Sequence, residues 1–91
     1  MSKILVEKPS AEKLASLGVT NWSTWSKEVS EFPWTYSSQE IAYILEGEVT
    51  VTPNDGSAAV SFGAGDLVTF PVGLSCTWHV KKALRKHYKF S

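Results

Sequence analysis

The chain has 91 residues, a single cysteine and a formal net charge of zero, so it fits one domain without an internal disulfide or a basic surface for nucleic acid. No segment approaches the roughly 20 apolar residues that cross a membrane, and the first residues lack the apolar stretch of a secretory signal. We therefore expect one domain over residues 1–91, located in the cytoplasm, with neither a membrane nor a nucleic acid as partner.

The N-terminal segment predicts one strand and one short helix. Residues 3–8 (KILVEK) alternate in the way that is typical of a peripheral β-strand. Ser10 is a suitable N-cap for a helix over residues 11–17, and the glycine that follows is suited to end it. Leu14 and Leu17 are three positions apart, so we expect them to attach one face of this helix to the rest of the protein.

From residue 19 onward the helical period disappears, and β-rich segments follow one another. Residues 19–36 are rich in aromatic and β-branched residues, with a break expected at Pro33. Residues 39–56 predict two strands that are joined at Glu46-Gly47 and end in an Asn-Asp-Gly turn. Further strands are expected in the segments SAAVSF, LVTF, CTWHV and ALRKHYKF. Such short strands and frequent turns indicate an all-β fold, either an antiparallel sandwich or a closed barrel, with one short helix.

Two segments carry a more specific pattern, EIAYILEGEVTV from Glu40 and GAGDLVTFPVGLSCTW from Gly63. They resemble the two motifs of the cupin superfamily, HxHxxxE followed by a strand, and then GDxxxxPxGxxH. The whole chain resembles the small single-domain cupins grouped with the (S)-ureidoglycine aminohydrolase cupin domain. This resemblance implies a double-stranded β-helix, a jelly-roll barrel with one open mouth that holds a pocket.

Three histidines and one glutamate hold the metal in metal-binding cupins. The resemblance aligns these four positions with Trp34, Tyr36, Glu40 and Cys76. A loop one residue longer would place Pro33 and Thr35 at the first two positions, and neither provides an imidazole. All three histidines are therefore replaced, and only the carboxylate is kept.

Glu40 and Cys76 are the remaining candidates for metal ligands, but two ligands are too few for the usual zinc, manganese or iron site. Tyr36 is a poor third ligand because a phenol ionises only at about pH 10. His79 faces outward if Cys76 faces inward, because neighbouring side chains of a strand alternate. No motif fixes the direction of His87. We predict no cofactor, with a divalent transition metal as the alternative.

If the alternation of the strands holds, the barrel mouth is lined by aromatic rings, one acid and one thiol. The predicted ligand-binding residues are Trp34, Tyr36, Glu40, Cys76 and Trp78, with Ala42 and Ile44 deeper. Such a lining is typical of a small-molecule site, although the rings could also simply fill the barrel. A carboxylate among rings needs a donor, for which Arg85 and Lys89 are the candidates.

Glu40 and Cys76 are also the candidates for catalysis. A cysteine nucleophile needs a neighbouring base or cation, and burial as a small hydrophobic side chain is the competing interpretation of Cys76. We expect the protein to bind a small polar or sugar-like metabolite in the mouth without a complete metal site. The alternative is an enzyme acting on a ureido or amide-type nitrogen metabolite, either metal-dependent or with Glu40 as general base. A homodimer formed through the N-terminal strand is a further expectation.

Overall fold

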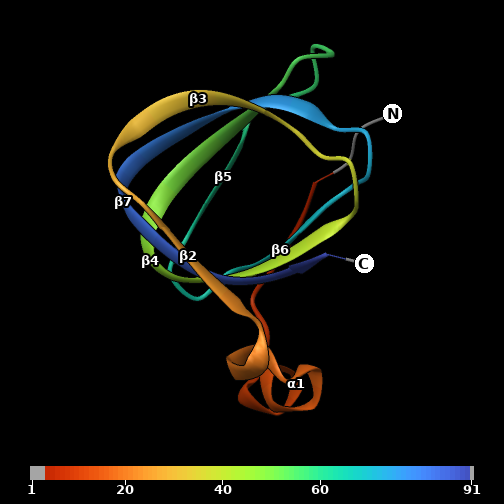
Figure 1. Ribbon diagram of the computed structural model, residues 1–91, viewed down its shortest axis with the longest axis vertical. Helices are drawn as coiled ribbons and strands as arrows, with labels where there is room; N and C mark the ends of the chain where they lie inside the picture. The colour runs from red at the N-terminus through yellow and green to blue at the C-terminus, as the bar shows by residue number, and fades with distance from the viewer. Residues whose placement is uncertain (1–3, 91) are drawn as a thin grey trace.

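The structure is a computed structural model that describes residues 4–90 (Figure 1). Its elements, in chain order, are β1 (Leu5–Glu7), α1 (Ala11–Leu17), the 3-10 helix η1 (Val19–Asn21), β2 (Ser23–Lys27), β3 (Ser30–Thr35), β4 (Glu40–Pro53), β5 (Val60–Gly63), β6 (Leu67–Phe70) and β7 (Ser75–Phe90). Lys3, which belongs to the predicted first strand, lies outside the described residues. None of the helices in the described part is long and apolar enough to cross a membrane.

The two longest strands, β4 and β7, pair with each other and organise the sheet. Strand β7 also pairs with β2 and β3, whereas β4 also pairs with β5 and β6, and β1 adds to β6. All of these pairings are antiparallel. Figure 1 shows the strands curving around a central space, with α1 outside it. The prediction of an all-β fold with one short helix is confirmed.

Helix α1 begins and ends at the predicted residues. The Ser10 hydroxyl accepts a hydrogen bond from the backbone N–H of Lys13, and Gly18 ends the helix with φ of 69°. The expected attachment through its leucines is weak, because Leu14 is only half-buried and Leu17 is 36% exposed. Val19, directly after the helix, is buried and provides the apolar contact instead.

Strand β4 corrects the prediction of two strands joined at Glu46-Gly47. It is one strand whose pairing with β7 shifts register between Ile44 and Val49. Gly47 lies in this bulge with φ of 108°, and a Cβ atom there would lie 2.7 Å from the Ala83 carbonyl oxygen. The sequence signal was therefore a bulge, which a glycine permits because it has no side chain to collide with the neighbouring strand.

The expected break at Pro33 is also wrong, because β3 continues through this residue and pairs it with Thr77 of β7. Within residues 4–90, β3 has β7 as its only partner strand. A proline is tolerated on an edge strand because its missing N–H falls on the side that needs no partner. Pro33 therefore marks an edge of the sheet.

The barrel interior is filled by aliphatic and aromatic side chains. The buried core cluster consists of Tyr36, Ala42, Ile44, Val49, Val51, Phe62, Val68, Phe70, Leu74, Cys76, Trp78, Val80 and Leu84. Its aromatic rings contact one another, for example Tyr36 stacked on Phe70 with centroids 4.9 Å apart. The described chain has no disulfide, so this packing holds the small barrel together.

Candidate functional site

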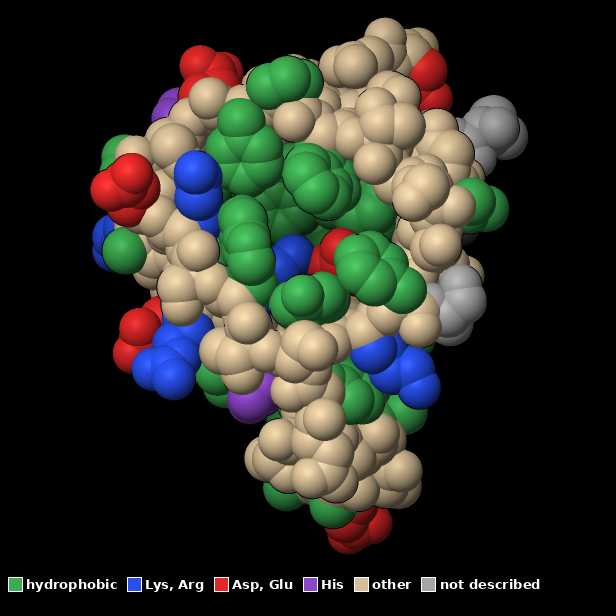
Figure 2. Space-filling model, in the orientation of Figure 1, with side chains coloured by type: hydrophobic (Ala, Val, Ile, Leu, Met, Phe, Trp, Pro, Cys, Tyr) green, Lys and Arg blue, Asp and Glu red, His purple; other side chains and the backbone are tan. Residues whose placement is uncertain are grey.

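A hollow of about 270 Å³ opens at one side of the barrel. Its lining consists of Trp25, Phe32, Trp34, Tyr36, Glu40, Trp78, Lys86, Tyr88 and Phe90. In Figure 2 blue and red atoms lie among green side chains in this hollowed region. Seven of the nine lining residues are aromatic, and the two others are one lysine and one glutamate. The site is thus an aromatic mouth with one pair of charged groups.

Strand pairing explains why these side chains meet. In the β3–β7 pairing Trp34 lies opposite Cys76, and Phe32 lies opposite Trp78. In the β2–β7 pairing Trp25 lies opposite Lys86. Because side chains of paired residues share one face of the sheet, the first half of the chain brings its rings over the inward face of β7.

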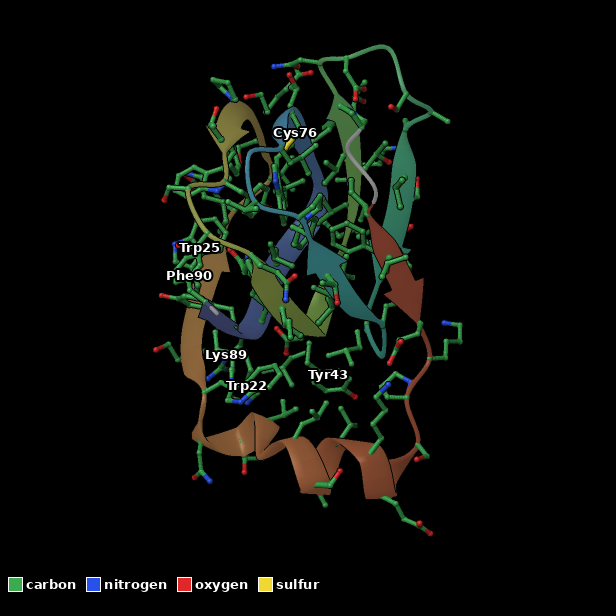
Figure 3. All side chains as sticks on the ribbon, turned by 90° about the vertical axis from the view of Figure 1, so that its right-hand side faces the viewer. Trp22, Trp25, Tyr43, Cys76, Lys89 and Phe90 are labelled. Carbon is green, nitrogen blue, oxygen red and sulfur yellow. The ribbon has the colours of Figure 1, made fainter. Side chains whose placement is uncertain are left out.

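Glu40 and Lys86 form a buried ion pair, with Lys86 Nζ 2.6 Å from Glu40 Oε2. Their exposed fractions are only 3% and 6%. The donor expected for Glu40 was Arg85 or Lys89, and both expectations are wrong. Arg85 is exposed, and Lys89 Nζ lies over the Trp22 ring at 5.8 Å (Figure 3).

Three aromatic rings surround the Lys86 ammonium group. The Nζ atom lies 4.8 Å from the ring centroid of Trp78, 5.1 Å from that of Trp25 and 5.5 Å from that of Tyr88. These distances suit cation–π attraction, which partly replaces the lost hydration of the cation. Burial lowers the pKa of Lys86 below its ordinary value, and the neighbouring Glu40 carboxylate offsets part of this effect.

Tyr36 supports the mouth more than it offers a reactive group. Its hydroxyl oxygen accepts a hydrogen bond from Trp78 Nε1 at 3.2 Å, and the residue is only 2% exposed. Burial raises the pKa of the Tyr36 phenol far above its ordinary value, and the nearby Glu40 charge raises it further. The phenol therefore stays protonated and holds the Trp78 indole in place.

Cys76 lies outside the lining of the hollow, contrary to its expected place in the mouth. It is fully buried, its thiol donates to the Trp34 carbonyl oxygen at 3.6 Å, and Figure 3 shows it toward one end of the barrel, away from Trp25 and Phe90. Burial raises the pKa of its thiol to about 11. Such a thiol carries little thiolate at neutral pH, so the structure favours the interpretation of Cys76 as a small hydrophobic side chain.

Trp34 and Phe90 form an exposed rim around the hollow. They are 47% and 52% exposed, whereas Tyr36 and Trp78 beneath them are buried. The rim thus presents large apolar surfaces to solvent beside a buried pair of charges. An exposed group of large apolar side chains beside a concave surface is typical of a binding site.

The family of the chain follows from comparison with known proteins. The model of the EutQ-like cupin domain matches residues 14–88. The chain belongs to the EutQ-like cupin family. Among proteins with curated descriptions, none matches this EutQ-like cupin.

Solved structures of similar proteins agree with this family. A DUF861-family protein from Thermotoga maritima is 50% identical, with a TM-score of 0.95 over 98% of this chain and 100% of its own. A putative ethanolamine utilization protein Q from Salmonella typhimurium is 23% identical, with a TM-score of 0.65 over 96% of this chain and 68% of its own. The EutQ protein of Clostridium difficile is 17% identical, with a TM-score of 0.67 over 98% and 68%. The last two similarities show the fold alone.

The donor groups of this EutQ-like cupin do not fit the metal that the superfamily resemblance implies. Glu40 is engaged by Lys86, and Cys76 is outside the hollow. His79 is exposed, as the strand alternation predicted, and the His87 ring contacts the Thr24 hydroxyl at 3.2 Å. Within residues 4–90, no group of three or more His, Cys, Asp or Glu side chains is placed to hold a metal ion. The chemistry of this mouth is that of an ion pair among rings.

Sequence reasoning found four residues of this mouth, Trp34, Tyr36, Glu40 and Trp78, and missed the rest. The missed residues are Trp25, Phe32, Lys86, Tyr88 and Phe90. A signal for three of them was present in β7. The alternation that turns Cys76, Trp78 and Val80 inward is interrupted at the exposed Lys82. It resumes at Leu84, and the same every-second-residue spacing then reaches Lys86, Tyr88 and Phe90.

Proposed function

We propose that this EutQ-like cupin binds a small hydroxylated metabolite, of the size and character of a monosaccharide, in the aromatic mouth of its barrel. The observation that carries the proposal is the buried Glu40–Lys86 pair inside a solvent-open ring of aromatic side chains. Such a site combines a few fixed polar groups with a largely apolar wall, which is the common composition of small-molecule sites.

The two kinds of lining group match the two kinds of surface on a sugar-like molecule. The apolar C–H face of a sugar ring packs against an aromatic face, whose negative charge density attracts the slightly positive hydrogens. The rim rings of Trp34 and Phe90 are exposed for such contact. Glu40 accepts hydrogen bonds from hydroxyl groups and Lys86 donates them, so both ends of the pair remain useful to the ligand.

The size of the hollow limits the ligand. Its volume of about 270 Å³ lies just below the roughly 300–1,000 Å³ that ligand pockets span. The mouth therefore suits one small ring or a short chain of carbons, and it is too small for an oligosaccharide buried along its whole length.

Calorimetric titration tests the proposal with methyl β-D-glucoside and myo-inositol as probes. Trp34→Ala removes a rim ring that is 47% exposed, so the fold should survive while binding weakens by roughly three- to tenfold, the worth of one aromatic contact. Val72→Ala is the matched control, because Val72 is 65% exposed and lies outside the lining. Equal affinity of both variants, or no binding of either probe, would count against the proposal.

A further inference from the structure

Lys86 is the one lysine that lines the mouth among the described residues, and its surroundings set it apart from an ordinary surface lysine. Its side chain is 7% exposed, whereas that of Lys82 on the same strand is 73% exposed. A buried amine facing a cavity that admits small molecules is placed for reaction with a bound carbonyl carbon. An ion pair that served only to stabilise the fold would not need to face this cavity.

We propose that Lys86 forms a reversible imine with a small aldehyde or ketone that enters the aromatic mouth. This inference rests on the proposed function, because it assigns the carbonyl form of a small hydroxylated metabolite, such as an open-chain sugar, to the same site. Glu40 serves as the proton acceptor and donor for Lys86. Three observations support the proposal: the 2.6 Å contact between Lys86 Nζ and Glu40 Oε2, the three aromatic rings around Lys86 Nζ, and the open hollow that this lysine lines.

The first step is a proton transfer within the pair. The ammonium proton moves from Lys86 Nζ to the Glu40 carboxylate along the 2.6 Å hydrogen bond, which leaves a neutral amine beside a neutral carboxylic acid. Burial favours this exchange because it removes two charges from a poorly hydrated site at once. The lowered pKa of Lys86 acts in the same direction.

The amine lone pair then attacks the carbonyl carbon, the C=O π electrons move to oxygen, and a proton passes from nitrogen to that oxygen to give a carbinolamine. Glu40 next donates its proton to the hydroxyl group, the C–O bond breaks, and water leaves. The nitrogen lone pair forms the C=N bond. The products are an iminium ion on Lys86 and the Glu40 carboxylate, so one water is released and the net charge is unchanged.

The rings favour the product as well as the resting state. The iminium nitrogen is positive and takes the place of the ammonium nitrogen, at about the same distances from the rings of Trp25, Trp78 and Tyr88. The cation–π attraction and the Glu40 contact are therefore kept when the imine forms.

Reductive trapping tests the inference directly. The whole chain is incubated at pH 7 with D-glyceraldehyde and sodium cyanoborohydride, whose hydride converts an imine into a stable secondary amine. Peptide mapping then gives the initial rate of modification at each lysine. We expect Lys86 to react at least about tenfold faster than the exposed Lys82, because the bound aldehyde is held beside the amine.

Two variants separate proton transfer from simple placement. Glu40→Gln keeps a hydrogen-bond acceptor for Lys86 but cannot donate a proton to the carbinolamine hydroxyl group, so loss of water, and with it trapping at Lys86, should slow by about tenfold or more. Lys82→Met is the matched control and should leave trapping at Lys86 unchanged. Circular dichroism checks the fold of each variant. The comparison of Lys86 with Lys82 in the unaltered protein stays informative even if a variant fails to fold.

Methyl β-D-glucoside, which has no free carbonyl group, keeps this inference separable from the proposed function. Modification confined to exposed lysines, while methyl β-D-glucoside still binds the mouth, would overturn the imine and leave the binding function intact. No trapping at Lys86 together with no binding of the glucoside would overturn both. Trapping concentrated at Lys86, and slowed by Glu40→Gln, would support the inference.

Discussion

The substitution Lys86→Met tests the energetic description of the mouth most sharply. It replaces the buried ammonium with an apolar side chain of similar length and leaves Glu40 buried without its partner. At a separation of 2.6 Å, two unit charges attract by about 6 kcal/mol at an effective dielectric constant of about 20. The burial of two ions offsets most of this attraction, so the pair as a whole contributes little net stability.

The loss of one partner has a different effect from the loss of both. We expect Lys86→Met to lower the free energy of unfolding by roughly 3–5 kcal/mol, because a desolvated carboxylate remains. A domain of 91 residues has roughly 5–14 kcal/mol in total, so the variant should still have a measurable unfolding transition. The double variant Glu40→Leu/Lys86→Met should return close to the parent, since neither charge is left.

Urea unfolding at pH 7 of the parent, both single variants and the double variant gives the coupling free energy of the pair. The matched control is Lys82→Met, which breaks the exposed Lys82–Glu48 pair at 2.8 Å and should leave the unfolding midpoint nearly unchanged. If the two single losses simply add in the double variant, the buried pair described above does not exist in solution.

Three further predictions concern residues outside the mouth. Cys76 should react slowly with iodoacetamide at pH 8 and faster toward pH 11, because its pKa rises from an ordinary value of 9.0 to about 11 on folding. The raised pKa also means that the contribution of this thiol to stability is fully present below about pH 9 and is lost between pH 9 and pH 11. Rapid alkylation at pH 8 would disprove its burial. Burial raises the pKa of Asp66, but hydrogen bonds from Lys8 and from the Gly63 backbone hold it below its ordinary 3.8. The contribution of Asp66 to stability is present above pH 3.8 and is lost as the pH falls through the lowered pKa, so in acid unfolding the stability difference between the parent and Lys8→Met should shrink as the pH falls below 3.8. Gly47→Ala should lower the thermal midpoint clearly, because its Cβ would collide with the Ala83 carbonyl oxygen at 2.7 Å, and an unchanged midpoint would contradict the close approach of the two strands.

The oligomeric state remains a prediction. Leu5 and Val6 of β1 are 50% and 40% exposed, and β1 is the end strand of the main sheet path. An apolar strand at an open edge favours pairing with a second copy. Static light scattering should then give the mass of a dimer, and a monomer at high concentration would remove this expectation.

The fold could be predicted from the sequence because its signals are local. The cap at Ser10, the stop at Gly18 and the alternation after Glu40 each depend on a few neighbouring residues. Gly47 showed where the chain is irregular, but a glycine in a strand signals a turn and a bulge equally well. Only the continued pairing with β7 distinguishes the two cases.

The mouth was harder to predict because its charged pair joins residues 46 positions apart. The sequence indicated that Glu40 needs a donor, but the choice among nearby basic residues depends on which face of β7 each one occupies. The motif pattern ends at Trp78, so it does not distinguish Lys86 from Arg85 and Lys89. Cys76 was predicted in the mouth and does not line it. Its side chain points inward as expected, but an inward side chain need not reach the part of the interior that is open.

The indole N–H signals of the four tryptophans test the central claim, that the mouth binds a small hydroxylated ligand. Trp25, Trp34 and Trp78 line the hollow, whereas Trp22 does not and serves as an internal control. In a heteronuclear NMR titration with methyl β-D-glucoside, we predict that the three mouth signals shift in a saturable way while the Trp22 signal stays in place. No shift, or equal shifts at all four tryptophans, would contradict the claim.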